Sequence, residues 1–211
     1  MKGLILKDFY TMSSTLKIYA FLILVYVAVF GIMENNPISA IMVSTQVISM
    51  CPVNALAYDE QVKWDKIART APVSAKEIVV AKYIFSLLMA VAAAVFSTLA
   101  IIIVDKFRNT SDCLIAMVMA IQLAMFYHSL LFPTIYKFGT TKGRIYTMLI
   151  MFIPAILVAL FSFVGFWTSA VIIMLTDYGE LCAAAIVLLI VLMYIGSVGL
   201  SVNIYKNKDL Y

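Results

Sequence analysis

The residues that carry most enzyme chemistry are sparse in this 211-residue sequence, and their spacing fits none of the usual catalytic sites. Its one histidine, His128, belongs to no H-E-x-x-H motif, and no paired carboxylates or serine–histidine arrangement falls within an apolar stretch. The cysteines Cys51, Cys113 and Cys182 lack the spacing of metal ligands. We therefore expect no catalytic residues and no metal site, and a membrane-embedded transferase or protease is disfavoured.

A glycine-containing basic segment, Lys137–Arg144 (KFGTTKGR), could touch a phosphate group. It lacks the G-x-x-x-x-G-K-[ST] pattern, however, and it follows no predicted strand, so it is not the phosphate-binding loop of an ATPase. That pattern occurs nowhere else in the sequence either. We expect the chain itself to bind no ATP and no other cofactor.

Uncharged polar residues gather within two apolar stretches, where they could hydrogen-bond to a transported molecule. The candidates for lining such a path are Gln46, Asn54, Gln122, Tyr127 and His128. Small and polar residues also hold helices together inside membranes, and for His128 this structural role is favoured. No charged residue is expected at mid-depth, which argues against a proton-driven antiporter or a voltage sensor. An amphipathic or hydrophobic cargo fits such an uncharged path.

The longest hydrophilic segment, Tyr58–Glu77, holds most of the remaining distinctive residues. Within it Asp59–Arg69 (DEQVKWDKIAR) is compatible with a helix. Its apolar residues recur at helical spacing, at Trp64, Ile67, Ala68 and Ala71. Pro72 should end this helix, and Ser74 with Glu77 fits a capping box for the next one. The pattern predicts a short helix projecting from the membrane surface; a solvated charged loop is the alternative.

The N-terminal segment, residues 1–16, reads as an amphipathic helix lying along the membrane. Its apolar residues recur at helical spacing, at Ile5, Phe9, Met12 and Leu16. Polar residues fall elsewhere on the helix, at Lys7, Asp8, Thr11 and Ser14. Such a helix could be a membrane-surface anchor or could contact a partner, and the pattern favours neither.

These residues belong to a chain that is 64% hydrophobic and 12% charged, too apolar for a soluble domain of this size. A helix needs about 20 mostly apolar residues to cross a bilayer, and the alternating strands of a barrel are absent. We predict an all-α polytopic membrane protein, a single domain over residues 1–211, with six transmembrane helices. The predicted spans are Ile18–Met33, Ile38–Ala57, Ile78–Val104, Leu114–Tyr136, Ile145–Phe166 and Leu181–Tyr205.

The distribution of basic residues orients these spans. Thirteen of the 15 lysines and arginines lie in the N-terminal segment, in or next to the loops after the second and fourth spans, and at the C-terminus. Only Lys106 and Arg108 lie on the other side. Basic residues of short loops stay in the cytoplasm, so both termini are predicted to be cytoplasmic. The net charge of +4 thus reflects topology and indicates no nucleic-acid binding.

Two features of the opposite side complete the prediction. Gly165–Leu175 is too short for a seventh span, and we interpret it as a short helix dipping back into the outer leaflet, with Trp167 at the interface. Cys113 and Cys182 both fall near that face, where they could form a disulfide. A role as small apolar packing residues is favoured for both.

Several short motifs follow one another along the chain. They are the amphipathic start Met1–Asp8, then Tyr58–Glu60, Trp64–Lys66, Arg69–Ser74, Glu77–Val79 and Lys82–Tyr83, and finally Phe132–Pro133, Lys137–Gly139 and Lys142–Arg144. In this order the chain resembles the ABC-2 type permeases, the membrane subunits of one class of ATP-binding-cassette exporters. It looks most like the small six-span permeases of Gram-positive bacteria that include phenol-soluble modulin exporter subunits. One departure is that the family often has a glycine soon after the acidic residue of its coupling loop, where this chain has Gln61-Val62-Lys63.

The resemblance implies that the Asp59–Arg69 helix is a coupling helix seated in a groove of a separate ATPase, which carries ATP and Mg²⁺. The implied ATPase-coupling residues are Asp59, Glu60, Trp64, Asp65, Lys66 and Arg69, with Trp64 as the apolar anchor. The interface helix with Ile5, Phe9 and Met12 would pack beside it, and Gly165–Leu175 would be the outer re-entrant element. Two permease chains would pair, as a homodimer or with a related permease.

We therefore interpret the chain as a permease subunit of an exporter in the cell membrane of a Gram-positive bacterium, and not as an enzyme. The expected cargo is an amphipathic or hydrophobic molecule, such as a toxic or antimicrobial peptide, a lipid-like molecule or a drug. The alternative is a membrane receptor or immunity protein that binds a peptide without transporting it. The predicted coupling helix argues against this alternative.

Overall fold

The computed structural model describes residues 2–33, 36–68, 70, 72–104, 110–163 and 179–207, with side chains for all of these except 32, 65, 151, 153–163, 179–180 and 182. Throughout these residues the regular structure is helical and contains no strand. The helices are α1 Lys2–Thr11, α2 Ser13–Tyr26, the π-helix η1 Val27–Met33, α3 Pro37–Ile48, α4 Cys51–Gln61, α5 Trp64–Ala68, α6 Ala75–Val104, α7 Thr110–Phe138, α8 Thr140–Phe163 and α10 Gly179–Lys206.

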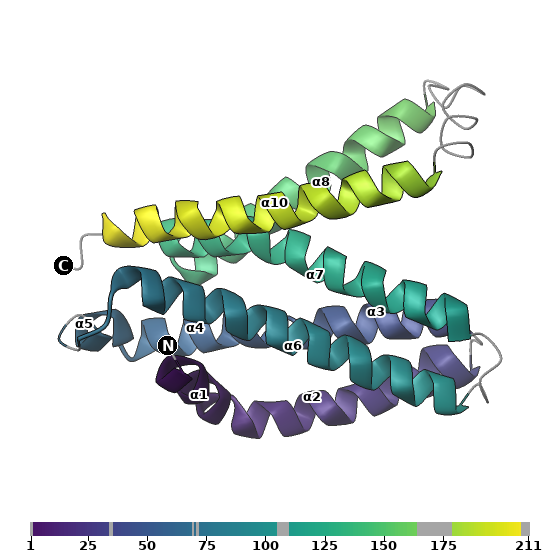
Figure 1. Ribbon diagram of the computed structural model, residues 1–211, viewed down its shortest axis with the longest axis horizontal. Coiled ribbons are helices and arrows are strands. Elements are labelled where there is room, and N and C mark those ends of the chain that lie inside the picture. Colours follow the sequence, from purple (N-terminus) through teal and green to yellow (C-terminus); the bar gives the residue numbers. More distant parts are fainter. Residues whose placement is uncertain are drawn as a thin grey trace.

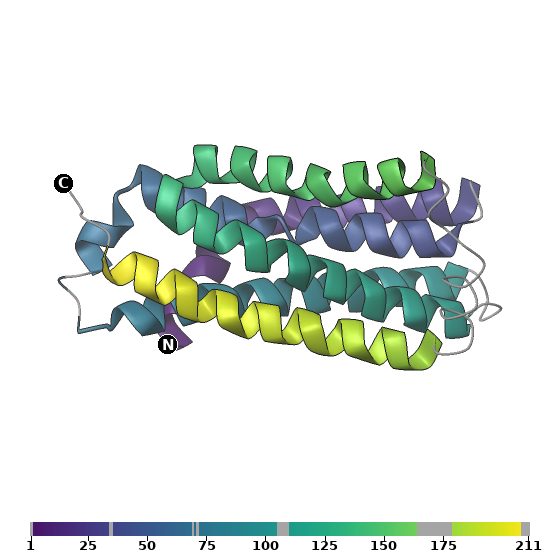
Figure 2. The ribbon, with the colours of Figure 1, turned by 90° about the horizontal axis from the view of Figure 1, so that it is seen from above.

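The helices form an elongated bundle in which most of them run along the long axis (Figure 1). One end of this bundle holds α5, the first turn of α6 and the last turn of α10 (Figures 1 and 2). The N-terminus lies toward the same end. This arrangement is the one expected of a chain that crosses a membrane an even number of times. We refer to this end as the α5 end.

Five helical stretches in the described residues are long and apolar enough to cross a membrane. They are Ser13–Gly31, Pro37–Gln61, Ala75–Val104, Thr110–Phe138 and Ala183–Lys206. The remaining predicted span, Ile145–Phe166, overlaps α8, which is a helix of 24 residues. The sixth crossing stays a prediction. Gly165–Leu175 and Trp167 lie outside the described residues, as does the Cys182 side chain, so the re-entrant helix and the disulfide stay untested; Cys113 is buried.

The N-terminal segment differs from the single helix predicted over residues 1–16. The first helix ends at Thr11, and the next begins at Ser13 and continues directly into the first membrane stretch. Met12 lies between them with φ −93° and ψ 1°, outside the helical region, and its side chain is fully buried. The chain therefore turns at Met12, because burying this side chain holds α1 against the bundle where α2 begins the first candidate span.

The second predicted span is interrupted rather than continuous. Its first turn is stabilised, because the Asn36 side chain accepts a hydrogen bond from Ser39 N at 3.1 Å and Pro37 occupies the first helical position. It breaks after Ile48, since Pro52 has no backbone N–H to continue the ladder. Val53 N then donates to Met50 O at 3.1 Å. The carbonyl of Ser49 is consequently left for a partner outside the helix.

The segment 137–144, expected as a loop, is helical except at Gly139. Gly139 has φ +83°, a conformation that a residue with a side chain rarely adopts, and its N–H caps α7 by donating to Ile135 O at 2.8 Å. One turn into α8, a side chain at Gly143 would lie 2.8 Å from Ile135 Cα. The two glycines thus permit a one-residue connection between closely packed helices.

The core at the α5 end joins the helices that matter most for the site. Its fully buried aromatic pair is Tyr83 from α6 and Phe132 from α7, packed edge to face with ring centroids 4.6 Å apart. Tyr83 Oη also lies 2.6 Å from Ser197 Oγ and 2.7 Å from Ser201 Oγ, both on α10. Buried polar groups that are satisfied in this way fix the relative position of three helices.

Candidate functional site

A sharp corner between α4 and α5 projects at the α5 end of the bundle (Figure 1). The single helix predicted over Asp59–Arg69 is wrong, because α4 runs through Asp59 and Glu60 to Gln61 and a new helix starts at Trp64. Lys63 stands between them with φ 52°, in the left-handed region. This conformation ends a helix and usually belongs to glycine.

The corner exposes apolar side chains at its tip. Val62 is 60% exposed and Ile67 is 55% exposed. On the other side of α5, Ala68 is buried and Trp64 is half-buried against the core at the α5 end. The α5 helix thus has one face rooted in the bundle and another face that presents an apolar residue to the surroundings.

Two lysines and two aspartates form a closed ring beneath this corner. Lys7 Nζ lies 2.7 Å from Asp59 Oδ1 and 3.1 Å from Asp8 Oδ1. Lys82 Nζ lies 2.6 Å from Asp8 Oδ1 and 2.6 Å from Asp59 Oδ2, the latter an ion pair outside hydrogen-bond geometry. The ring alternates positive and negative charge and is neutral as a whole. It connects α1, α4 and α6.

Burial makes this ring more than a surface ion pair. Asp8 is 1% exposed and Lys82 is 4% exposed, and Asp59 is also buried. Ions taken out of water lose hydration free energy, which only close and mutual pairing offsets. All four contacts are short, so each of the buried ions has two partners of opposite sign. The ring is therefore stable as a set and intolerant of losing one member.

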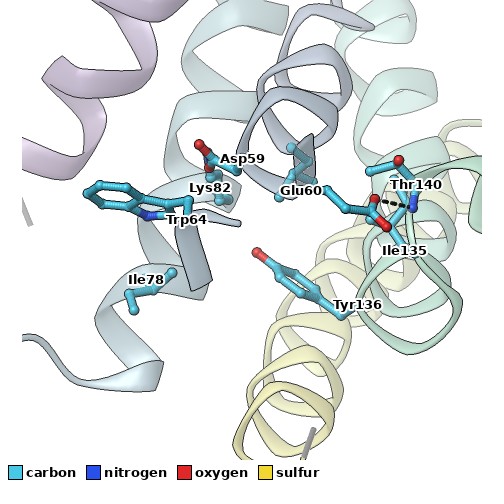
Figure 3. A pocket seen from close by; sticks show the side chains of 10 residues that line it. Asp59, Glu60, Trp64, Ile78, Lys82, Ile135, Tyr136 and Thr140 are labelled. Carbon is cyan, nitrogen blue, oxygen red and sulfur yellow. Dashed lines mark hydrogen bonds and ion pairs between the residues drawn. The ribbon is translucent and has the colours of Figure 1, made fainter. Parts of the chain in front are cut away.

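Lys7 also ties α1 to α5. Its Nζ lies 4.3 Å from the centroid of the Trp64 ring, a cation–π contact. Figure 3 shows Trp64 beside Asp59 and Lys82, near the point where α4 meets α6. Trp64 is consequently engaged within the chain, so the structure gives it the role of fastening α5 to the bundle.

Glu60 makes a second connection, to the start of α8. Its Oε2 accepts a hydrogen bond from Thr140 N at 2.7 Å, as the dashed line in Figure 3 marks. A carboxylate at this place satisfies a free N–H of the first turn and interacts favourably with the helix dipole. A side chain at Gly139 would lie only 2.7 Å from Glu60 Oε1. The glycine therefore leaves room for the carboxylate.

A cavity of about 40 Å³ lies between these groups. Its walls are Leu56, Asp59, Glu60, Trp64, Ile78, Lys82, Ile135, Tyr136, Gly139 and Thr140. Such a volume holds a few water molecules at most and no organic ligand. Among the residues that the structure describes, no group of three or more histidine, cysteine, aspartate or glutamate side chains is arranged to hold a metal ion. The geometry at this end suits mechanical connection.

The predicted path residues are distributed over several environments. His128 is buried, and its Nε2 lies 2.7 Å from Ser49 O, the carbonyl freed by the interruption of the second span. Since a carbonyl can only accept, Nε2 carries the proton. Tyr127 is also buried, and its hydroxyl lies 3.6 Å from Met50 Sδ. These two residues bind the interruption between α3 and α4.

The other three candidates lie elsewhere. Asn54 Nδ2 donates to Tyr19 Oη at 2.7 Å, and Asn54 Oδ1 accepts from Arg144 Nη2 at 3.0 Å, so Asn54 joins α2, α4 and α8. Gln46 is half-buried on α3, and its Oε1 has no hydrogen-bond partner among the described residues. Gln122 is half-buried in the wall of an apolar groove of about 540 Å³ between α7 and α10. The structure does not bring the five residues into one cavity.

The helix α1 occupies part of the predicted interface segment, and its faces differ from the prediction. Met12 and half-buried Ile5 pack against the bundle as expected of apolar positions, whereas Phe9 is exposed. Asp8, which falls away from the apolar positions of the predicted helix, is buried in the bundle. The ion pair with Lys82 compensates for the loss of hydration when the Asp8 carboxylate is buried.

Sequence reasoning missed the partners of Asp59. Lys82 was counted as a loop residue, although it lies eight positions into a helix that begins at Ala75. An ionisable residue inside an apolar stretch normally needs a partner of opposite charge, and this rule was the available signal. Nothing in the spacing of Lys7 and Asp8 could have identified them as those partners, because they come from a separate helix.

The sequence model of the family described as "ABC-2 family transporter protein" matches residues 3–206. No curated protein and no solved structure matches the chain.

Proposed function

Because the chain belongs to the ABC-2 transporter family, whose membrane components work with an ATPase partner, we propose that it is the permease subunit of an ATP-driven exporter. In this proposal the α4–α5 corner docks into a groove of a separate ATPase, which binds ATP and Mg²⁺. Two permease chains, identical or related, enclose the path. The α5 end lies in the cytoplasm, since the lysines and arginines collect there.

One observation carries the docking part of this proposal. The corner exposes apolar side chains, Val62 and Ile67, on a short helix that is fastened to the bundle from behind. Exposed apolar residues held on a rigid support are suited to burial in a partner's groove. Docking here costs little ordering entropy, because Trp64 and the charge ring already hold α5 in place.

The same contacts offer a way to transmit motion. A displacement of the corner would be passed to α6 through the Asp59–Lys82 pair and to α8 through the Glu60–Thr140 hydrogen bond. ATP binding changes the permease only if the inward-open and outward-open states have different free energies of docking. The two connections join the docking surface to separate spans, so such a difference would reach α6 and α8 through different contacts.

We propose an amphipathic or hydrophobic cargo, with peptides as the leading class. Asn54, Tyr127 and His128 are engaged in contacts within the chain. Gln122, by contrast, lines an apolar groove of about 540 Å³. A groove that is apolar except for one amide fits a molecule with a hydrophobic face better than it fits an ion.

Association with an ATPase tests the docking surface directly. The chain is co-expressed with a soluble ATPase that has a Walker motif and is encoded in an adjacent reading frame, and the complex is purified through the permease. We expect Ile67→Asp to reduce the co-purified ATPase by at least about tenfold, since it places a charge in an apolar contact.

The matched control is Ile38→Asp, the same substitution at an exposed isoleucine in the first turn of α3, at the opposite end of the bundle. It should leave the amount of ATPase unchanged. An unmodified chain that never associates with any ATPase would show that the exporter proposal is wrong. Equal losses for both variants would remove only the docking assignment.

A further inference from the structure

The described acidic side chains of the docking end are all engaged inside the chain. Asp8 and Asp59 belong to the charge ring. Glu60 accepts the hydrogen bond from the first turn of α8. Glu77 accepts two hydrogen bonds from Ser74, both at 2.9 Å. Asp8 and Asp59 are consequently buried in ion pairs, and Glu60 and Glu77 each accept hydrogen bonds within the chain, although the resemblance implied that Asp59 and Glu60 contact the ATPase.

The basic residues of the corner are in the opposite situation. Lys63 and Lys66 are exposed, and neither has an ion pair among the described residues. The segment from Val62 to Thr70 contains three basic residues and only one acid, Asp65. Unpaired charges of one sign close to exposed apolar residues produce a local positive potential. The corner therefore presents cations around the apolar tip formed by Val62 and Ile67.

We propose that the groove of the ATPase that receives this corner has an apolar floor and a rim of carboxylates. This inference rests on the proposed function and adds the chemistry of the partner. Val62 and Ile67 would be buried on the floor, and Lys63 and Lys66 would pair with acids at the rim. Complementary rim charges mainly accelerate association and select the correct partner. A permease with this corner would thus discriminate against ATPases whose grooves carry basic rims.

Anionic lipid headgroups are the other source of negative charge at a membrane surface. The family match favours a protein partner, because the membrane components of ABC-2 transporters work with an ATPase.

The test measures association kinetics between the co-purifying ATPase and the chain in nanodiscs of zwitterionic lipid, at increasing ionic strength. For the unmodified chain, we expect the association rate constant to fall as ionic strength rises. Lys63→Glu/Lys66→Glu should lower that constant by about tenfold or more at low ionic strength and reverse its dependence on salt. The matched control is Lys17→Glu/Lys206→Glu, which alters exposed lysines outside the corner by the same total charge.

The outcomes separate this inference from the function on which it rests. An ATPase that binds at a rate insensitive to salt and to the corner variant would overturn the acidic rim and leave the exporter intact. Equal effects of the corner and control variants would also overturn it, because the attraction would then be general. If the corner variant changed only the binding of anionic vesicles, the lysines would serve the lipid surface. Failure of the unmodified chain to bind the ATPase at any ionic strength would refute the exporter itself.

Discussion

Asp59 illustrates how the sequence can single out a residue without showing what surrounds it. The resemblance implied that Asp59 contacts an ATPase, and in the structure its side chain is buried between two lysines of its own chain. The sequence shows that Asp59 is charged and lies beside an apolar span. It does not show that α1 folds back to deliver Lys7 and Asp8, because that contact joins residues about fifty positions apart.

The charge ring predicts an asymmetry between single and double substitutions. Lys82→Met leaves two aspartates facing one lysine in a buried place, and removing one partner of a buried pair costs about 3 kcal/mol or more. Asp8→Asn/Lys82→Met keeps the neutral pair of Lys7 and Asp59. Thermal unfolding in detergent should therefore show a large drop in the midpoint for the single variant and a smaller drop for the double variant.

Lys142→Met, at an exposed position, is the control and should leave the midpoint unchanged. If the double variant were as unstable as Lys82→Met alone, the net charge of the ring would not determine its stability.

The elements were predictable to different degrees. The apolar stretches gave the helices, and the capping box is confirmed, since Ser74 N and Oγ bind Glu77 Oε2 and Glu77 N donates to Ser74 Oγ at 3.2 Å. Local signals of this kind act within one turn and can be read from neighbouring residues. The separation of α4 from α5 could not be read, because helix propensity favours continuation through Gln61-Val62-Lys63.

The left-handed conformation of Lys63 gives a prediction for the corner. A non-glycine residue in this region costs about 1 kcal/mol, and glycine removes that cost. We expect Lys63→Gly to raise the unfolding midpoint of the isolated chain, whereas Lys66→Gly, inside α5, should lower it. A lower midpoint for Lys63→Gly would mean that the lysine side chain contributes more than the backbone strain costs.

At the scale of the whole molecule, composition and motifs predicted an ABC-2 permease, which the family match confirms, and the topology predicted from the basic residues stays a prediction. The pairing of helices was not predictable in the same way. Helix surfaces that face lipid and those that face another helix are built from similar apolar residues. The sequence therefore could not show which of Gln46, Asn54 or Gln122 faces a translocation path.

The positions of the helix ends predict which residues can be reached from outside a cell. In a background with the native cysteines replaced by alanine, Met33→Cys should react with a membrane-impermeant maleimide on intact cells, since Met33 is 80% exposed at the end of the first span. Gln61→Cys and Asn207→Cys, at the α5 end, should react only after the cells are opened. Reaction of either one from outside would contradict the proposed orientation.

The gap between α3 and α4 has a mechanical consequence. The helices α3 and α4 have 12 and 11 residues, and each is about 17 Å long. They meet at Ser49 and Met50, where the imidazole of His128 contacts the carbonyl of Ser49. A displacement of α4 can change its angle to α3 at Ser49 and Met50 while α3 keeps its packing contacts. A continuous helix over the same residues would transmit that displacement along its whole length.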